Sequence, residues 1–319
     1  MNDTFKRLLA KFGPFVGLLL VIALFSIPAE TREFFLTYQN FKIILTQTVI
    51  VAVAALGMTM IIVSGGIDLA AGSTVAFASV VGALLIQKGW GPAGVVTACV
   101  LSGAVVGVAN GAMIAGMRMM PFIITLGTLG IVRGSAQLLA DSQVVNYDDS
   151  PINTWMRTAD PFGYALPVGV WVTIGVALAT AVVLRRTVFG RHIFALGSNE
   201  TTARLCGVPT RRLKIWTYAF GGAFFGLAGL FQLSRLGQGD PTVAVGLELD
   251  IIAAVIIGGA SLSGGVGTVL GSMIGALTMA VLRNGSQQMG WGTPLQQVII
   301  GVVIIAAVFL DRLRQSGKG

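Results

Sequence analysis

The sequence has few of the residues that carry catalysis, metal binding or disulfide bonding. Its 319 residues include two cysteines, one histidine and 13 acidic residues, and only 11% of them are charged. His192 has no second histidine with which to form a metal site, and Cys99 and Cys206 show neither metal-binding nor redox spacing. We therefore predict no metal site in this chain.

Motifs for nucleotide and hydrolytic chemistry are also missing. The sequence contains no GxxxxGK[ST] phosphate loop, no HExxH and no GxSxG. We expect no catalytic residues and no bound cofactor. A membrane-embedded transferase would need a polar catalytic cluster, and the sequence shows none.

Apolar residues are what the chain has in excess, since they make up 55% of it and the mean hydropathy is +0.84. Several apolar runs reach the roughly 18 to 20 residues that cross a hydrocarbon core. We predict an all-α polytopic membrane protein, a single domain over 1–319 with about ten membrane-spanning helices. The first run, 12–27, has the length of a signal peptide, but its flank SIPAE is a poor cleavage site and favours an uncleaved span.

The net charge of +8 is explained by topology and requires no nucleic acid partner. Lys and Arg beside membrane spans are held on the cytoplasmic side, and seven of them lie in the segment 185–214. More lie near both ends of the chain. We predict that this segment and both termini are cytoplasmic, that the acid-rich segments 141–164 and 235–250 are external, and that 283–293 is a short turn.

A short helix is predicted over 200–205, inside the basic segment. Ser198 or Asn199 can cap it, Glu200 in its first turn suits the helix dipole, and Gly207 can end it. A helix this short is unstable alone in water, where roughly 12 residues are needed. It must pack against something, and two alternatives stay open: another protein, or the helix ends of its own chain.

Two glycine-rich segments, 65–73 and 258–267, interrupt the apolar runs, and we expect breaks or tight turns there. Irregular backbone at membrane depth must be covered by protein or line a water-filled cavity, so both segments are candidates for a solute path. The alternative role for Asp68 is to cap a helix at the cytosolic surface. The alternative for Arg133 is that its side chain snorkels toward the outer surface. The candidate path residues are Gly65, Gly66, Asp68, Asn110, Arg133, Gly258, Gly259, Ser261 and Asn284.

The two glycine-rich segments align with each other at a constant offset of 193 residues, which pairs Gly65 with Gly258. Repeated halves with interrupted helices are typical of transporters whose substrate crosses between the halves. We predict such halves over about 43–140 and 215–311. Close helix packing is an alternative reason for the repeat, because GxxxG steps also occur, for example over 103–111 and 222–226.

A transporter of this composition would need an external source of energy. Proton- and sodium-coupled carriers often use carboxylates inside their spans, and apart from Asp68 at a break the predicted spans offer none. The energy is then expected to come from another protein, which contacts the basic segment. An ion- or proton-coupled carrier, or a passive channel, acting alone is the alternative.

Four segments in a fixed order carry a resemblance to a known family. They are SGGIDLAAGS (64–73), MPFIITLGTLGIVRG (120–134), FGRHIFALGSNETTARLCGV (189–208) and ELDIIAAVIIGGASLSGG (248–265). Over nearly the whole chain the sequence resembles the permeases of bacterial ABC importers for ribose- and xylose-type monosaccharides. The resemblance implies a subunit in the inner membrane, a second permease copy as homodimer or heterodimer, separate ATPase subunits that bind the ATP, and a periplasmic sugar-binding protein.

The resemblance also implies that the short cytoplasmic helix is a coupling helix that inserts in the ATPase subunit. Thr201 and Thr202 depart from the family pattern, which more often has a small residue and alanine there. The candidate coupling residues are Ser198, Asn199, Glu200, Ala203, Arg204 and Gly207. On the outer face we predict that acidic residues seat the binding protein, namely Glu248, Asp250, Asp148 and Asp149.

Overall fold

The computed structural model describes residues 3–157 and 166–316, which are mostly α-helical. The first part contains α1 (Asp3–Ser26), α2 (Ala29–Phe35), α3 (Tyr38–Val63), α4 (Ala71–Gln87), α5 (Pro92–Met117) and α6 (Pro121–Leu139). A short connection follows, with β1 (Val145–Asn146), η1 (Pro151–Asn153) and α7 (Thr154–Arg157). The second part contains α8 (Val168–Arg186), α9 (Val188–Ser198), α10 (Glu200–Leu205), α11 (Thr210–Leu236), β2 (Gln238–Gly239), α12 (Leu247–Ile257), α13 (Val269–Gln288) and α14 (Thr293–Ser316).

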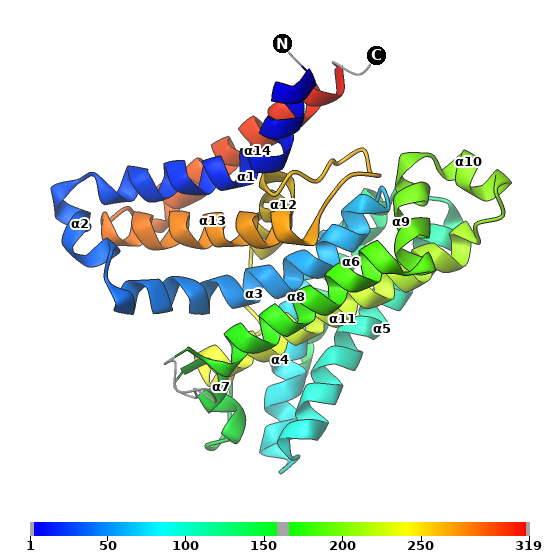
Figure 1. The fold of residues 1–319 in the computed structure, drawn as a ribbon. Helices are drawn as coiled ribbons and strands as arrows, with labels where there is room; N and C mark the ends of the chain where they lie inside the picture. The colour runs from blue at the N-terminus through cyan, green and yellow to red at the C-terminus, as the bar shows by residue number, and fades with distance from the viewer. Residues whose placement is uncertain (1–2, 158–165, 317–319) are drawn as a thin grey trace.

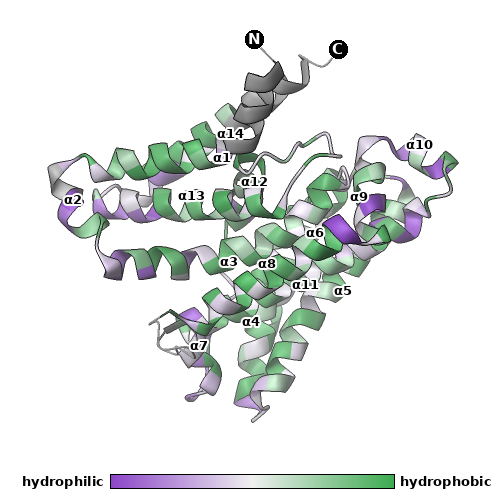
Figure 2. Cartoon of the chain, viewed as in Figure 1, coloured by the Kyte–Doolittle hydropathy of each residue, from purple (hydrophilic) through white to green (hydrophobic). Residues whose placement is uncertain are grey.

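Four helices within the described residues, α3, α5, α6 and α8, are long and apolar enough to cross a membrane. Shorter apolar helical stretches occur at Gly13–Ser26, Ala71–Gln87 and Thr293–Val303. Figure 2 shows apolar residues along most helices and hydrophilic residues gathered around α2, α7 and the α9–α10 region. The chain is therefore a polytopic helical membrane protein, as predicted, and the count of ten spans stays a prediction.

Helix α3 forms the centre of the assembly and runs through the middle of the view in Figure 1. Its apolar window is 89% buried, against 22% for that of α5. Helices α5 and α11 cross in direct contact, because a Cβ atom on Gly103 or Gly107 would meet the backbone of α11, and one on Gly222 or Gly226 would meet that of α5. The close packing predicted from the GxxxG spacing is confirmed.

The basic segment 185–214 is largely helical, where the sequence suggested a loop with one short helix. Helix α8 continues through Arg186, Thr187 caps α9 by accepting a hydrogen bond from the Gly190 N–H at 3.1 Å, and α11 already begins at Thr210. Local capping explains the extra helix, because Thr187 satisfies an N–H group that has no partner inside α9. Helix α10 lies at one end of the molecule, and α2 and α7 lie at the other (Figure 1).

The two segments predicted to be external lie together in space. Strands β1 and β2 pair antiparallel, with Val145 opposite Gly239 and Asn146 opposite Gln238, so a two-residue ladder supplements the predicted all-α fold. Residues 158–164 of the first segment lie outside the described residues. The predicted turn at 283–293 is wrong in extent, because α13 continues to Gln288 and leaves only 289–292 between helices.

The two glycine-rich segments do break the helices, and both preceding helices end in the same way. Gly65 and Gly259 have φ values of 83° and 89°, and the residue after each donates its N–H to the carbonyl five residues earlier, at 2.9 and 3.1 Å. This is a Schellman motif. By this motif Gly65 corresponds to Gly259, whereas the offset of 193 residues paired it with Gly258. The second break, 258–268, is also longer than the first, 64–70.

Candidate functional site

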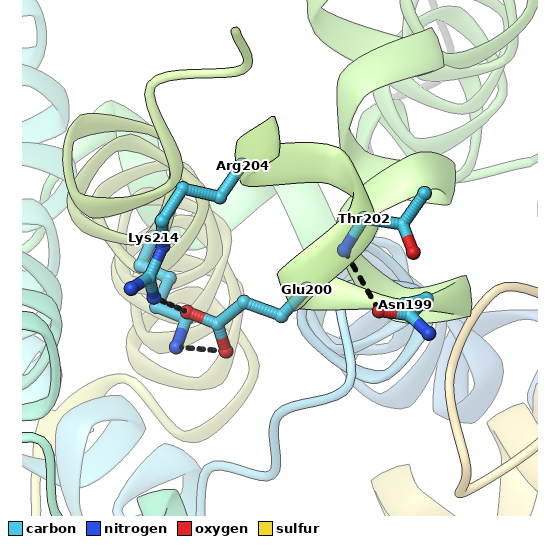
Figure 3. A network of polar contacts seen from close by, with 5 residues as sticks. All are labelled: Asn199, Glu200, Thr202, Arg204 and Lys214. Atoms are coloured by element: carbon cyan, nitrogen blue, oxygen red, sulfur yellow. Dashed lines mark hydrogen bonds and ion pairs between the residues drawn. The ribbon is translucent and has the colours of Figure 1, made fainter. Parts of the chain in front are cut away.

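Helix α10 forms over the residues predicted for it, Glu200–Leu205. Asn199 is its N-cap, since the Oδ1 atom accepts a hydrogen bond from the Thr202 N–H at 2.9 Å (Figure 3). Ser198, the other candidate cap, is the last residue of α9. Gly207, with φ of 83°, ends the helix in the left-handed conformation that favours glycine. The sequence thus located both ends of this helix.

The inner face of α10 rests on its own chain. Ala203 is 5% exposed, and together with Val208 it packs into a cluster with Leu184, Leu196 and Leu213 from α8, α9 and α11. The contact supplies the apolar support that so short a helix needs. Of the two alternatives left open by the sequence, packing on the chain's own helix ends is therefore present.

Glu200 ties α10 to the start of α11. Its Oε1 atom accepts a hydrogen bond from Arg204 at 3.2 Å and its Oε2 atom accepts one from the Lys214 ammonium at 2.8 Å (Figure 3). Partial burial raises the pKa of the Glu200 carboxyl, but the hydrogen bonds and charges of Lys214 and then Arg204 outweigh that effect and hold the pKa below its ordinary value. Glu200 is consequently ionised at neutral pH.

The outer face of α10 is open and carries one large apolar side chain. Leu205 is 84% exposed, and Thr201, Thr202 and Cys206 are exposed beside it. Exposure of one leucine is not unusual, but here it lies on a helix that keeps its small Ala203 buried. Sequence reasoning missed Leu205, although it is the only large apolar residue of 199–207.

A basic groove of about 840 Å³ runs beside α10. One wall is α10 with the start of α11, and the other is the connection between α5 and α6. Five cationic side chains line this groove, namely Arg118, Arg204, Arg211, Arg212 and Lys214. The surface around α10 is therefore positively charged and suits an acidic partner surface.

Both helix breaks meet α9 directly before α10 begins. The Gly265 N–H donates to the Val63 carbonyl at 2.8 Å, and a Cβ atom on Gly197 would meet both of these groups. A Cβ atom on Gly264 would lie 2.6 Å from the Gly197 carbonyl oxygen and 3.0 Å from the Cα atom of Gly65. We call these four glycines, together with Val63, the glycine junction. It joins the two breaks to the end of α9, directly before α10.

Asp68 holds the first break from inside the protein. It is 1% exposed, and its carboxylate accepts hydrogen bonds from the Ala70 N–H at 2.9 Å and from the Asn110 amide of α5 at 3.3 Å. The Tyr218 hydroxyl of α11 donates to the Ile67 carbonyl at 3.1 Å. Asp68 is thus a turn-forming residue before α4, in the core and not at the cytosolic surface where the cap alternative placed it.

The remaining candidate path residues of the second half lie in packed contacts. Ser261 is buried and accepts a hydrogen bond from the Ser263 N–H at 3.2 Å. Asn284 is buried in α13, where its oxygen accepts from Gln288 at 3.4 Å. Gly258 lies against the backbone of Gly271. A role for these residues in a solute path stays a prediction.

Arg133 contacts the outer connection between α11 and α12. Its guanidinium donates to the carbonyls of Pro241 and Val243 at 2.8 and 2.6 Å. Sequence reasoning offered a path or snorkelling, and the structure places the charge on backbone carbonyls of the 240–246 segment, which connects α11 to α12. Arg133 thereby positions this loop.

The acidic docking candidates do not form one surface. Asp148 and Asp149 are exposed, and Glu248 is half-buried against Gly72 and Ala244. Asp250 is only 2% exposed, because it forms an ion pair with Arg283 of α13. Over the described residues, no group of His, Cys, Asp and Glu side chains is placed to hold a metal ion.

Helices broken at paired glycines, together with a short capped helix that faces outward from one end, define a membrane permease. The chain belongs to the family described as the permease component of the branched-chain amino acid transport system, which matches residues 40–308. Such a permease is not itself catalytic and holds no cofactor of its own, as predicted.

Curated relatives match along almost the whole chain. The ribose import permease protein RbsC of Escherichia coli K12 is 35% identical over 302 residues, which cover 94% of each chain. RbsC of Bacillus subtilis 168 is 37% identical over 319 residues, covering 98% of this chain and 96% of the relative. The galactose/methyl galactoside import permease protein MglC of Escherichia coli K12 is 34% identical, covering 99% and 98%. No solved structure matches the chain at a significant level.

Proposed function

We propose that this chain is the membrane-spanning subunit of an ABC importer that carries a monosaccharide of the ribose, arabinose or galactose type across a bacterial inner membrane. Membership of the permease family supports the proposal, and so do the sugars named for relatives that match almost the whole chain, which are ribose, L-arabinose and galactose. The partners are an ABC ATPase that supplies two ATPase domains, a second permease copy as homodimer or heterodimer, and a periplasmic sugar-binding protein.

The proposed topology has ten spans, with both termini and α10 in the cytoplasm. The spans are α1, α3, α4, α5, α6, α8, α11, α12, α13 and α14. Arginines at the end of α8 and the start of α11 flank the cytoplasmic side, and α2 and α7 lie at the opposite end (Figure 1). The single domain divides into halves over about 43–140 and 215–311, with 185–214 as the cytoplasmic coupling segment.

The proposed mechanism transmits ATP-driven movement through α10. Closure of the ATPase pair pulls on α10, and the glycine junction passes the movement to both helix breaks, because Gly197 of α9 touches each of them. The observation that carries the proposal is this contact, together with the exposed outer face of α10. The basic groove beside α10 would receive acidic residues of the ATPase subunit.

A substitution at Leu205 tests this coupling without disturbing the permease itself. Because the side chain is 84% exposed, Leu205→Asp should leave the unfolding midpoint unchanged while it lowers ATP-dependent sugar uptake more than about tenfold, the loss expected for a buried interface anchor. Leu205→Met is the matched control and should keep most of the uptake. The measurement uses proteoliposomes that contain the permease, its ATPase and the binding protein.

Full uptake by the Leu205→Asp variant would contradict the proposed coupling surface. Uptake by the permease alone, without ATPase or binding protein, would instead support the alternative of a secondary carrier or channel.

On the outer face, we propose that Asp148, Asp149 and Glu248 seat the binding protein, while Asp250 is occupied by Arg283. Charge reversal of Asp148 and Asp149 should weaken the affinity for the binding protein, measured by calorimetry.

A further inference from the structure

The basic groove beside α10 carries positive charge that its own lining does not neutralise. Its described lining has five cationic side chains and a single carboxylate, that of Glu200. This carboxylate is already paired with Arg204 and Lys214. The other three cationic side chains of the groove form no hydrogen bond or ion pair within the described part of the chain. They are Arg118, Arg211 and Arg212.

Two of these free arginines come together where α5 ends. Arg118 is the C-cap residue of α5. A Cβ atom on Gly116 would lie 3.9 Å from the Nη2 atom of Arg211, so the Arg211 guanidinium reaches from the start of α11 to the last turn of α5. Guanidinium groups bind phosphate through two parallel N–H donors. This end of the groove therefore suits a phosphate group held between the two helices.

The same end of the groove continues into apolar surface. Met119 and Met120, which are 41% and 72% exposed, line it. The helices on either side, α5 and α6, have apolar windows that are only 22% and 28% buried. Large exposed apolar side chains on them include Leu101, Val105, Phe122, Ile123 and Leu126. Acyl chains attached to a phosphate in the groove would lie on this surface, which a free phosphate ion would not use.

An exposed tryptophan marks the depth of the groove. Trp216 is 58% exposed and lies four residues after Arg212 on α11. Tryptophan side chains gather at the level of the lipid headgroups. In the proposed topology this level is the cytoplasmic side of the membrane, where basic pockets between membrane-spanning helices bind the headgroups of anionic lipids such as cardiolipin.

We infer that the α5–α6 end of the basic groove binds the phosphate headgroup of an anionic phospholipid, with Arg118 and Arg211 as principal contacts and Arg212 beside them. The inference rests on the proposed topology. It leaves the α10 end of the groove to the ATPase. The groove, at about 840 Å³, lies in the range of roughly 300–1,000 Å³ that holds drug-sized ligands, so one phosphate fills only part of it.

Native mass spectrometry of the delipidated full chain tests the site without ATPase or binding protein, because it counts bound lipids and chain copies together. Cardiolipin and phosphatidylglycerol should bind more tightly than zwitterionic phosphatidylethanolamine. The double variant Arg118→Gln/Arg211→Gln should weaken the dissociation constant for both anionic lipids about tenfold or more, because each basic residue near the headgroups adds to the attraction.

The double variant Arg185→Gln/Arg186→Gln is the matched control. It removes the same charge from the end of α8, outside the groove, and should leave the affinity for anionic lipids unchanged. All four arginines are exposed, so both double variants should unfold at the same midpoint as the wild type.

Four results would overturn the inference. Equal affinity for anionic and zwitterionic lipids would remove the headgroup selectivity, and equal losses in the two double variants would reduce it to general surface charge. Binding of inorganic phosphate as tightly as the lipid would assign the groove to a free anion. A changed number of chain copies in Arg118→Gln/Arg211→Gln, with lipid binding unchanged, would assign this surface to a second permease copy.

Failure of the proposed function gives a different pattern. Selective binding of anionic lipid by a wild type that shows no ATP-dependent sugar uptake would leave the lipid site intact and contradict the ATP-driven mechanism. Unselective lipid binding by a wild type with normal ATP-dependent uptake would contradict the lipid site alone.

Discussion

The two helix breaks share a sequence pattern and a helix ending but differ in how they are held. The first break, 64–70, is tied to α5 by the amide of Asn110, which donates to the buried carboxylate of Asp68, and to α11 by the hydroxyl of Tyr218. The same carboxylate accepts from the Ala70 N–H, directly before α4. The second break, 258–268, is longer and has no carboxylate. Inside it the Gly264 N–H donates to the Ser261 carbonyl, and the break contacts the Val63 carbonyl and α9.

This difference indicates that the first break is held more firmly than the second. Charged side chains with several buried hydrogen bonds resist displacement, because breaking any of them leaves buried polar groups unpaired. Backbone contacts between glycines lack such side-chain locks and allow sliding at short separation. We therefore expect the first break to move less than the second when α9 and α10 move, although both contact Gly197.

The comparison predicts the largest effect at Asp68. Replacement by Ala leaves the Ala70 N–H and the Asn110 amide unpaired in the core, and each such group costs roughly 1–3 kcal/mol, so Asp68→Ala should lower the free energy of unfolding by about 3 kcal/mol. Ser261→Ala, in the other break, should cost about 1 kcal/mol. Unfolding in detergent, followed by circular dichroism, measures both. Equal losses in the free energy of unfolding would show that the two breaks are held equally firmly.

The glycine junction should be the next most sensitive position. A Cβ atom on Gly197 would meet the Val63 carbonyl and the Gly265 N–H, both of which are backbone groups. Gly197→Ala should therefore cost about 2 kcal/mol through overpacking and should also reduce ATP-dependent uptake. Gly127→Ala on α6 is the control, because nothing lies within 4 Å of the added methyl group. A harmless Gly197→Ala would show that the junction is not tightly packed.

Tyr218→Phe removes one hydrogen bond that holds the first break. The hydroxyl that donates to the Ile67 carbonyl is lost while the ring stays in place, so the cost should be about 1 kcal/mol. If Asp68 and Tyr218 hold the same break, their effects should not add in the double variant. Thermal unfolding of the two single variants and the double variant measures this coupling. Strictly additive effects would show that the two contacts act independently.

The smallest effect on stability is expected at the ion pairs of α10, which are partly exposed. Because the pKa of Glu200 is held below its ordinary value of 4.5, its stabilisation is present above that pH and is lost as the pH falls through the lower folded-state pKa. The contribution should stay below about 1 kcal/mol. The difference in unfolding midpoint between wild type and Glu200→Gln should be constant near pH 7 and vanish under acid conditions. A difference that persists there would contradict the role of the charge.

Local signals in the sequence located much of the segment around α10. Asn199, Glu200 and Gly207 act within a few residues of their own positions, so capping chemistry was enough to place α10. Long apolar runs likewise predicted the membrane class, because hydropathy reports directly on the solvent that a helix can face. The extra helix α9 was missed, although its cap is also local, because Thr187 accepts a hydrogen bond from the Gly190 N–H three residues later.

The sequence alone determined that this is a helical membrane protein with two glycine breaks and a short, capped helix, because each of these depends on neighbouring residues. Only the tertiary structure decided that Gly197 closes the junction, that Asp68 faces Asn110, and that Asp250 pairs with Arg283. Those residues lie far apart in the chain, and helix crossing geometry, which no local pattern specifies, brings them together.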